Sequence, residues 1–152
     1  MIGCGGRDMA SPKGFILYRI WYGECMAYLG RTKQPLQARI RGHMFQKPMH
    51  RAISIHNVTK IEYAEFQTEA DMFLYEIYFI NKYKPPLNVD DKAHDDLTIT
   101  LPEADWKEFV PANWEEWKRE ISVPGAKDTE VWNRIRNQRA AETGGIIDLF
   151  CE

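Results

Sequence analysis

The stretch FILYRIWYGECMAYLGRTKQPLQARIRGH, from Phe15 to His43, decides the fold of this chain. Aromatic and branched residues fill 15–21 and 25–29, and the Tyr-Gly-Glu between them is typical of a turn. Pro35 is well placed to open a helix over 36–45, whose apolar residues recur every fourth position. The stretch therefore predicts an antiparallel hairpin followed by a helix.

Four polar side chains of this stretch are unlike those of an ordinary solvated surface. Tyr18 lies inside the first predicted strand, and Tyr28 lies in the second strand, two residues before a glycine. Arg39 and His43 are four residues apart in the predicted helix, so their side chains share one face. Two phenols, a guanidinium and an imidazole on adjoining elements predict a site that handles phosphate.

With these residues the chain resembles the GIY-YIG nucleases, and the resemblance covers residues 14–90. The two halves of the family name correspond to Ile16-Leu17-Tyr18 and Tyr28-Leu29-Gly30. The other family positions are matched at similar spacing by Thr32, Leu36, Arg39, His43, Glu76, Pro86 and Asn88. Ile16 replaces the first glycine of the name at a strand backbone position, and Gly30 is kept where we expect a tight bend.

The fold that this resemblance implies is an α/β (α+β) fold, with a small three-stranded, mainly antiparallel sheet flanked by helices. The alternating stretch Lys60–Phe66 is the third predicted strand. A helix over 69–82 follows, because Thr68 is a good N-cap and Pro85-Pro86 stops a helix.

Glu76 is the unusual residue of this second helix. Its helical neighbours three and four positions away are all apolar, namely Met72, Phe73, Phe79 and Ile80. A carboxylate in such surroundings needs a cation, a proton or a metal. The residues alone leave a structural pair with Arg39 open, whereas the resemblance implies that Glu76 binds a metal.

The resemblance implies hydrolysis of a phosphodiester bond with one Mg²⁺ or Mn²⁺ ion. Tyr18 is then the general base, and Tyr28 or the metal helps to position the water. A phenol is a poor base at neutral pH, so Arg39 and the metal would have to lower the Tyr18 pKa. Arg39 stabilises the phosphate, and His43 serves as an acid, a base or a phosphate donor.

The charge of the chain is uneven and predicts nucleic acid as a partner. Residues 13–60 carry nine Lys and Arg against Glu24 alone, whereas residues 89–152 are acidic. A compact basic segment is typical of binding to a polyanion. The residues expected to contact DNA are Arg31, Lys33, Arg41, Lys47 and Asn88; for Asn88, fastening of the loop after the second helix is an alternative.

The remaining segments form a lead-in, an extension and a tail. Residues 1–13 are a predicted flexible lead-in, and 91–143 a Trp-rich, acidic extension packed on the core, with helices expected at 103–110, 113–121 and 128–141. Residues 97–101 are a weaker candidate for a strand. In the tail, 144–152, the apolar stretch Ile146–Phe150 resembles peptides that bind sliding clamps, but folding of the tail onto its own core is favoured.

Composition excludes several classes of protein. No apolar run approaches the roughly 18 residues of a membrane span. The three cysteines are scattered, so we expect neither a disulfide framework nor a zinc site, and a reducing cytoplasm fits best.

The predicted function is a metal-dependent DNA endonuclease. A non-catalytic nucleic-acid-binding module and an interaction adaptor on the same fold remain the alternatives, and the oligomeric state is not legible.

Overall fold

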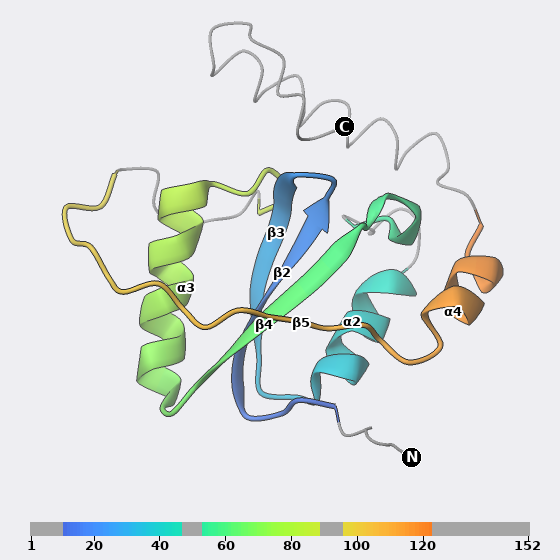
Figure 1. Ribbon diagram of the computed structural model, residues 1–152, viewed down its shortest axis with the longest axis horizontal. Coiled ribbons are helices and arrows are strands. Elements are labelled where there is room, and N and C mark those ends of the chain that lie inside the picture. The colour runs from blue at the N-terminus through green and yellow to red at the C-terminus, as the bar shows by residue number, and fades with distance from the viewer. Residues whose placement is uncertain (1–10, 47–52, 89–95, 123–152) are drawn as a thin grey trace, which may run out of the picture.

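The computed structural model describes residues 11–46, 53–88 and 96–122 (Figure 1). In these ranges the chain forms a four-stranded antiparallel sheet in the order β3-β2-β4-β5, with helices on both of its faces. The α+β fold class expected from the sequence is confirmed. None of the helices in the described ranges has the length and apolarity to cross a membrane.

The centre of the sheet is the strand β2 (Phe15–Tyr22). It pairs on one side with β3 (Cys25–Thr32) and on the other with β4 (Lys60–Phe66). The register of β2 with β3 shifts after Ile20, which leaves Ala27 as an extra residue. Before this shift, Tyr18 pairs with Gly30 and Ile20 pairs with Tyr28, which places these four residues on one face of the sheet.

Each face of the sheet is buried against a different helix. On one face Ile16, Tyr18 and Ile20 join a core with α2 (Leu36–Met44), to which Trp117 of α4 (Trp114–Glu120) also contributes. On the other face Leu17 packs with residues of α3 (Glu69–Tyr83). Figure 1 shows the sheet between α3 and the pair α2 and α4. The alternation along β2 thus decides which residues face which helix.

The helices α2, α3 and α4 begin and end within one residue of the bounds that the local sequence predicts. Pro35 precedes the first residue of α2, as expected. At the start of α3, the Thr68 hydroxyl accepts a hydrogen bond from the Asp71 amide at 3.0 Å. A single 3₁₀ turn, η2 (Ile55–Asn57), precedes β4. The helix predicted over 113–121 is confirmed as α4.

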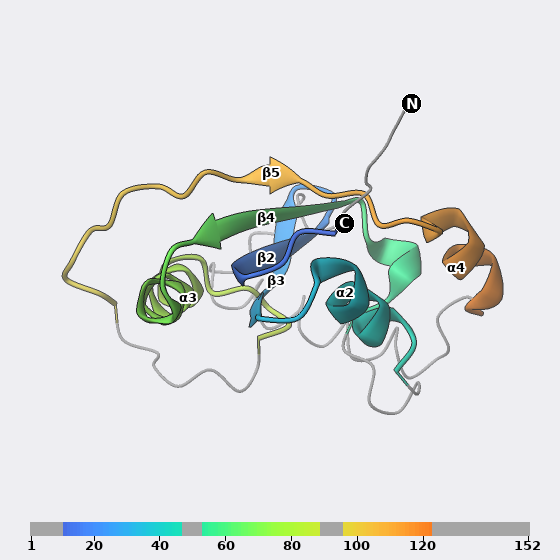
Figure 2. The same ribbon diagram turned by 90° about the horizontal axis from the view of Figure 1, so that it is seen from below.

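The predicted helix over 103–110 is wrong. This segment is extended and contains β5 (Lys107–Glu108), which pairs with Tyr63 and Glu62 of β4. The Phe109 amide also donates to the Ile61 carbonyl at 2.8 Å. The free edge of β4 offers these backbone partners, and Figure 2 shows β5 beside it. Residues 97–101 form no strand either, and there the Leu97 amide donates to Asn81 Oδ1.

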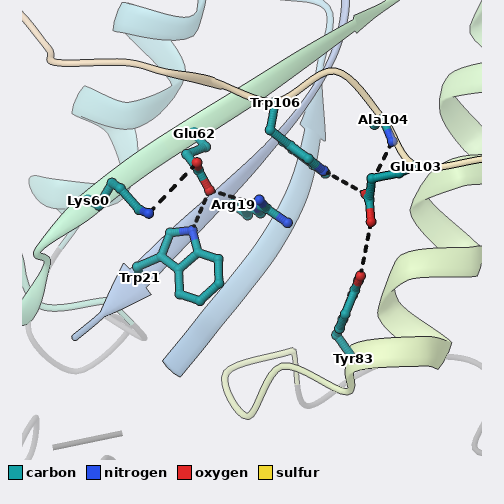
Figure 3. A network of polar contacts seen from close by, with 8 residues as sticks. All are labelled: Arg19, Trp21, Lys60, Glu62, Tyr83, Glu103, Ala104 and Trp106. Carbon is teal, nitrogen blue, oxygen red and sulfur yellow. Dashed lines mark hydrogen bonds and ion pairs between the residues drawn. The ribbon is translucent and has the colours of Figure 1, made fainter. Parts of the chain in front are cut away.

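A network of polar and aromatic side chains fastens this extended segment to the sheet (Figure 3). The Arg19 guanidinium lies between two indoles, 5.1 Å from the Trp21 ring centroid and 4.1 Å from that of Trp106. Glu62 Oε1 accepts hydrogen bonds from Arg19 Nε and Trp21 Nε1, both at 2.8 Å. Glu103 accepts from Trp106. Trp106 packs against the core on the α3 face, and Trp117 belongs to the core on the α2 face.

Several expectations fall on residues outside the described ranges. These are the first ten residues, Lys47, the helix expected at 128–141, and the tail with its candidate clamp peptide Ile146–Phe150. Cys25, the cysteine that lies in the described ranges, is disulfide-bonded, whereas the scattered cysteines gave no reason to expect a disulfide framework.

Candidate active site

Four of the predicted site residues come together between β2, β3 and α2. Tyr18 Oη lies 2.6 Å from His43 Nε2, and Arg39 Nε donates to the same phenol oxygen at 3.0 Å. The Tyr28 ring packs edge-on against His43, with 5.2 Å between ring centroids. We call Tyr18, Tyr28, Arg39 and His43 the four-residue cluster. Helical spacing on α2 and the cross-strand register of the hairpin bring its members together.

The cluster has a buried layer and an outer layer. Tyr18 has no exposed surface and His43 retains 8% of its own. Tyr28 is half-buried, and Arg39 is exposed. Arg39 uses Nε for Tyr18, and a guanidinium has further N–H donors. The outer layer therefore offers a phenol and a planar cation to solvent, while the inner layer holds a phenol–imidazole pair.

The electrostatics of Tyr18 differ from the sequence expectation. Burial, together with the neighbouring Tyr28, raises the pKa of Tyr18 well above its ordinary value, although Arg39 acts in the opposite direction. Arg39 does act to lower this pKa, as expected, but alone it does not bring the pKa below its ordinary value, because desolvation outweighs the guanidinium charge. Tyr18 keeps its proton.

His43 is neutral in this environment. Burial, with the nearby Arg39 charge, lowers the pKa of His43 from 6.5 to about 4. Because the Tyr18 oxygen already accepts a hydrogen bond from Arg39, we assign the Tyr18 O–H as donor to His43 Nε2. A buried neutral imidazole has a free lone pair for the phenolic O–H, although its lowered pKa makes it a weaker base than an exposed histidine.

The lowered pKa of His43 predicts a stability change with pH. Between pH 6.5 and about 4 the unfolded chain binds a proton at His43 that the folded chain does not, so stability falls as the pH falls through this window. From about pH 7 to about pH 5 the loss should be about 2 kcal/mol. Denaturant unfolding of wild type and His43→Gln at both pH values tests this. An equal pH dependence in both proteins would contradict it.

Gly30 has a reason other than the expected bend. It lies inside β3, and it is absent from the described glycines with positive φ, which are Gly14 and Gly23. A Cβ at Gly30 would lie 2.7 Å from Tyr18 Oη and 2.9 Å from Tyr28 Cε2. The glycine therefore leaves room for the two phenols of the cluster, so the expectation of a tight bend is wrong.

Gly30→Ala should consequently disturb the cluster. The added methyl group must displace the Tyr18 phenol from His43 and Arg39, and overpacking of this kind costs about 1–3 kcal/mol. Denaturant unfolding measures the loss. Gly42→Ala in α2 is the matched control, because a Cβ there meets nothing within 4 Å. The control should be neutral or slightly stabilising, since alanine favours helices. Equal stability of the two variants would refute the steric role of Gly30.

Glu76 lies on the other face of the sheet from the cluster. It accepts a hydrogen bond from Arg31 Nη1, and its side chain is 15% exposed. The alternative pairing with Arg39 is thus wrong, because Arg39 bonds Tyr18 on the α2 face. Arg31 and Tyr28 both belong to β3, which is an edge strand of the sheet. Glu76 and the cluster therefore contact this strand from opposite faces.

Asn88 fastens the segment after α3 to β3. Its Nδ2 donates to the Leu29 carbonyl at 2.8 Å, and its Oδ1 accepts from the Leu29 amide at 2.9 Å. The Leu87 amide donates to the Ala27 carbonyl beside it. The amide group of Asn88 is therefore engaged with the backbone, which favours the structural alternative over a contact with DNA.

The remaining predicted DNA contacts lie at the surface. Lys33 Nζ is 2.8 Å from Glu69 Oε2, and both side chains are exposed. Arg41 is exposed with its guanidinium 4.5 Å from the Phe45 ring centroid. Arg31 is half-exposed over the Phe73 ring. The surface contacts of Lys33 and Arg41 leave these two cations able to reach a phosphate backbone, whereas Arg31 is also paired with Glu76.

Comparison with known proteins finds relatives for about half of the chain. Over 77 residues it is 34% identical to UvrABC system protein C of Borrelia duttonii (strain Ly), and equally to that of Borrelia recurrentis (strain A1). These residues are 48% of this chain and 13% of each relative, so the chain spans a small part of the relatives it matches. No family model and no solved structure matches.

Proposed function

We propose that this protein is a metal-dependent DNA endonuclease that hydrolyses a phosphodiester bond at a single site. The observation that carries the proposal is the four-residue cluster, in which a buried Tyr18 joins a neutral His43 to an exposed Arg39. The GIY-YIG resemblance of these positions and the similarity to UvrABC system protein C support a nuclease relationship.

The proton of the attacking water has a route into the cluster. Because Tyr18 has no exposed surface, the water would meet the half-buried Tyr28 first. A hydrogen bond links the two phenols, so Tyr28 receives the proton and passes its own to Tyr18. Tyr18 in turn gives its proton to His43 Nε2. Tyr18 thus remains essential for removal of the proton, but it acts as a relay between Tyr28 and His43 rather than as a base that touches the water.

Arg39 is the residue placed to bind the scissile phosphate. Its Nε is fixed by Tyr18 while the guanidinium is exposed. The guanidinium N–H groups other than Nε can bind two phosphate oxygens in one plane, and they would stabilise the charge that develops as water attacks. The same hydrogen bond couples the position of the phosphate to that of the proton relay.

Glu76 is the residue proposed to hold the divalent ion. No group of three or more His, Cys, Asp or Glu side chains gathers within the described ranges. The proposal therefore uses the Glu76 carboxylate as the protein ligand. This donor set fits Mg²⁺, which is commonly held by one or two carboxylates, waters and substrate phosphates. When bound, the ion would supply positive charge to the phosphate oxygens.

Incubation of the protein with supercoiled, linear and single-stranded DNA, with and without Mg²⁺ or Mn²⁺, tests the proposal. Metal-dependent nicking of the supercoiled plasmid is the expected result, because one small site cuts one strand. A protein that binds DNA but never cleaves with either metal would overturn the proposal.

One observation favours a second function, a non-catalytic DNA-binding module. The Glu76 carboxylate already has the Arg31 guanidinium as partner, so it has a structural role without any metal. In that case the outer Arg39, Lys33 and Arg41 would bind phosphates, and neither metal would change the DNA. The same cleavage assay separates the two functions.

A further inference from the structure

Arg31 and Glu76 form an ion pair whose two ends differ in exposure. The Glu76 side chain is 15% exposed, whereas that of Arg31 is 48% exposed. The carboxylate is thus held in place by α3, while the guanidinium reaches it from β3 and is half in solvent. An ion pair of this kind can open by movement of the arginine alone.

Phe73 supports the arginine in this position. The Arg31 guanidinium lies 4.5 Å from the Phe73 ring centroid, and Phe73 is one helical turn before Glu76 on α3. The cation is therefore held between an aromatic ring and a carboxylate, both of the same helix. Within the described ranges, Arg31 is the cation that forms an ion pair with Glu76.

Two cations cannot use this carboxylate without repelling one another. Arg31 Nη1 donates to Glu76 Oε1, the kind of oxygen that a divalent ion would need. Binding of the ion would require the guanidinium to turn away or to share the carboxylate against repulsion at short range. The arginine is exposed enough to turn away, and a phosphate at the β3 edge would offer it a new partner.

We propose that Arg31 is a counter-ion latch on Glu76: it neutralises the carboxylate in the metal-free protein, and a divalent cation must displace it to bind. This inference rests on the proposed role of Glu76 as metal ligand. It gives a mostly buried carboxylate a counter-charge before any ion binds. The affinity for the ion then depends on Arg31 of β3 as well as on Glu76 of α3.

Mn²⁺ binding to the DNA-free protein tests the latch without any cleavage. Paramagnetic broadening of backbone amide signals around Glu76, followed through a Mn²⁺ titration, gives the affinity at this site. Arg31→Gln should bind Mn²⁺ about two- to fivefold more tightly than wild type, the range that a partly exposed ion pair corresponds to. Arg31→Lys keeps the charge and should stay closer to wild type.

Lys33→Gln is the matched control, since it removes a cation two residues away that pairs with Glu69 instead of Glu76. Its affinity should rise less than that of Arg31→Gln. An unchanged or lower affinity in Arg31→Gln, or an equal rise in Lys33→Gln, would overturn the latch.

Glu76→Gln separates failure of the latch from failure of the metal site. If this variant loses the broadening while Arg31→Gln matches wild type, the metal site stands and the latch is wrong. If wild type and Arg31→Gln show no broadening that depends on Glu76, the metal site itself is absent and the proposed mechanism falls with it.

Discussion

Glu76→Gln is expected to abolish metal-dependent DNA cleavage and to leave DNA binding intact or stronger. The amide keeps the shape of the side chain and can still accept a hydrogen bond from Arg31, but it lacks the negative charge that a hard divalent cation needs. DNA affinity should not fall, because a negative charge is removed from a surface that would face phosphate. Nicking of supercoiled plasmid and a gel-shift titration measure the two effects.

Glu69→Gln is the control for this substitution. Glu69 lies on the same helix and has a Lys33 partner at the surface, so its loss should leave cleavage close to wild type. Thermal unfolding of both variants guards against a trivial explanation, because Glu76 is also one half of an ion pair. Full cleavage activity in folded Glu76→Gln would contradict its role as the metal ligand.

Tyr18→Phe should lower the cleavage rate at least about 100-fold, the lower end of the effect for loss of a general base. The substitution removes one hydroxyl oxygen, which joins His43, Arg39 and Tyr28. Without it the proton has no route to His43, and the Arg39 side chain loses its fixed orientation. Single-turnover cleavage with saturating metal measures the chemical step.

Tyr22→Phe is the matched control on the same strand. Its hydroxyl accepts a hydrogen bond from the Ser54 amide, away from the cluster. This variant should lose some stability but keep the cleavage rate of wild type. Similar rates for Tyr18→Phe and wild type would show that the phenol is structural.

Local signals made much of the fold predictable. The alternation of Lys60–Phe66 and the cap at Thr68 place β4 and the start of α3 correctly. The segment 103–110 was not predictable in this way, because the partner that makes it extended is the free edge of β4. The side chains of this segment favour a helix by themselves, but backbone pairing with β4, which is distant in the sequence, outweighs that preference.

The members of the four-residue cluster could be predicted from the sequence, but the partner of Glu76, the burial of Tyr18 and the role of Gly30 could not. The motif spacing places Tyr18, Tyr28, Arg39 and His43 together, as the structure does. The sequence analysis missed Arg31 as the partner of Glu76, although the alternation of β3 could have indicated it. Arg31 lies two residues after Leu29 and therefore on the same face of the sheet, the one that packs against α3, whereas Arg39 belongs to the helix on the opposite face. Burial of Tyr18 and the clearance at Gly30 depend on close packing, which spacing does not report.

The two-residue strand β5 protects the sheet from self-association. Without it, β4 would present its outer backbone groups, beside an Arg19 stripped of the Trp106 indole. Exposed edges of this kind recruit strands of other chains and lead to aggregation. A core that ends before β5 would therefore be expected to form assemblies, although every residue of the four-residue cluster would still be present.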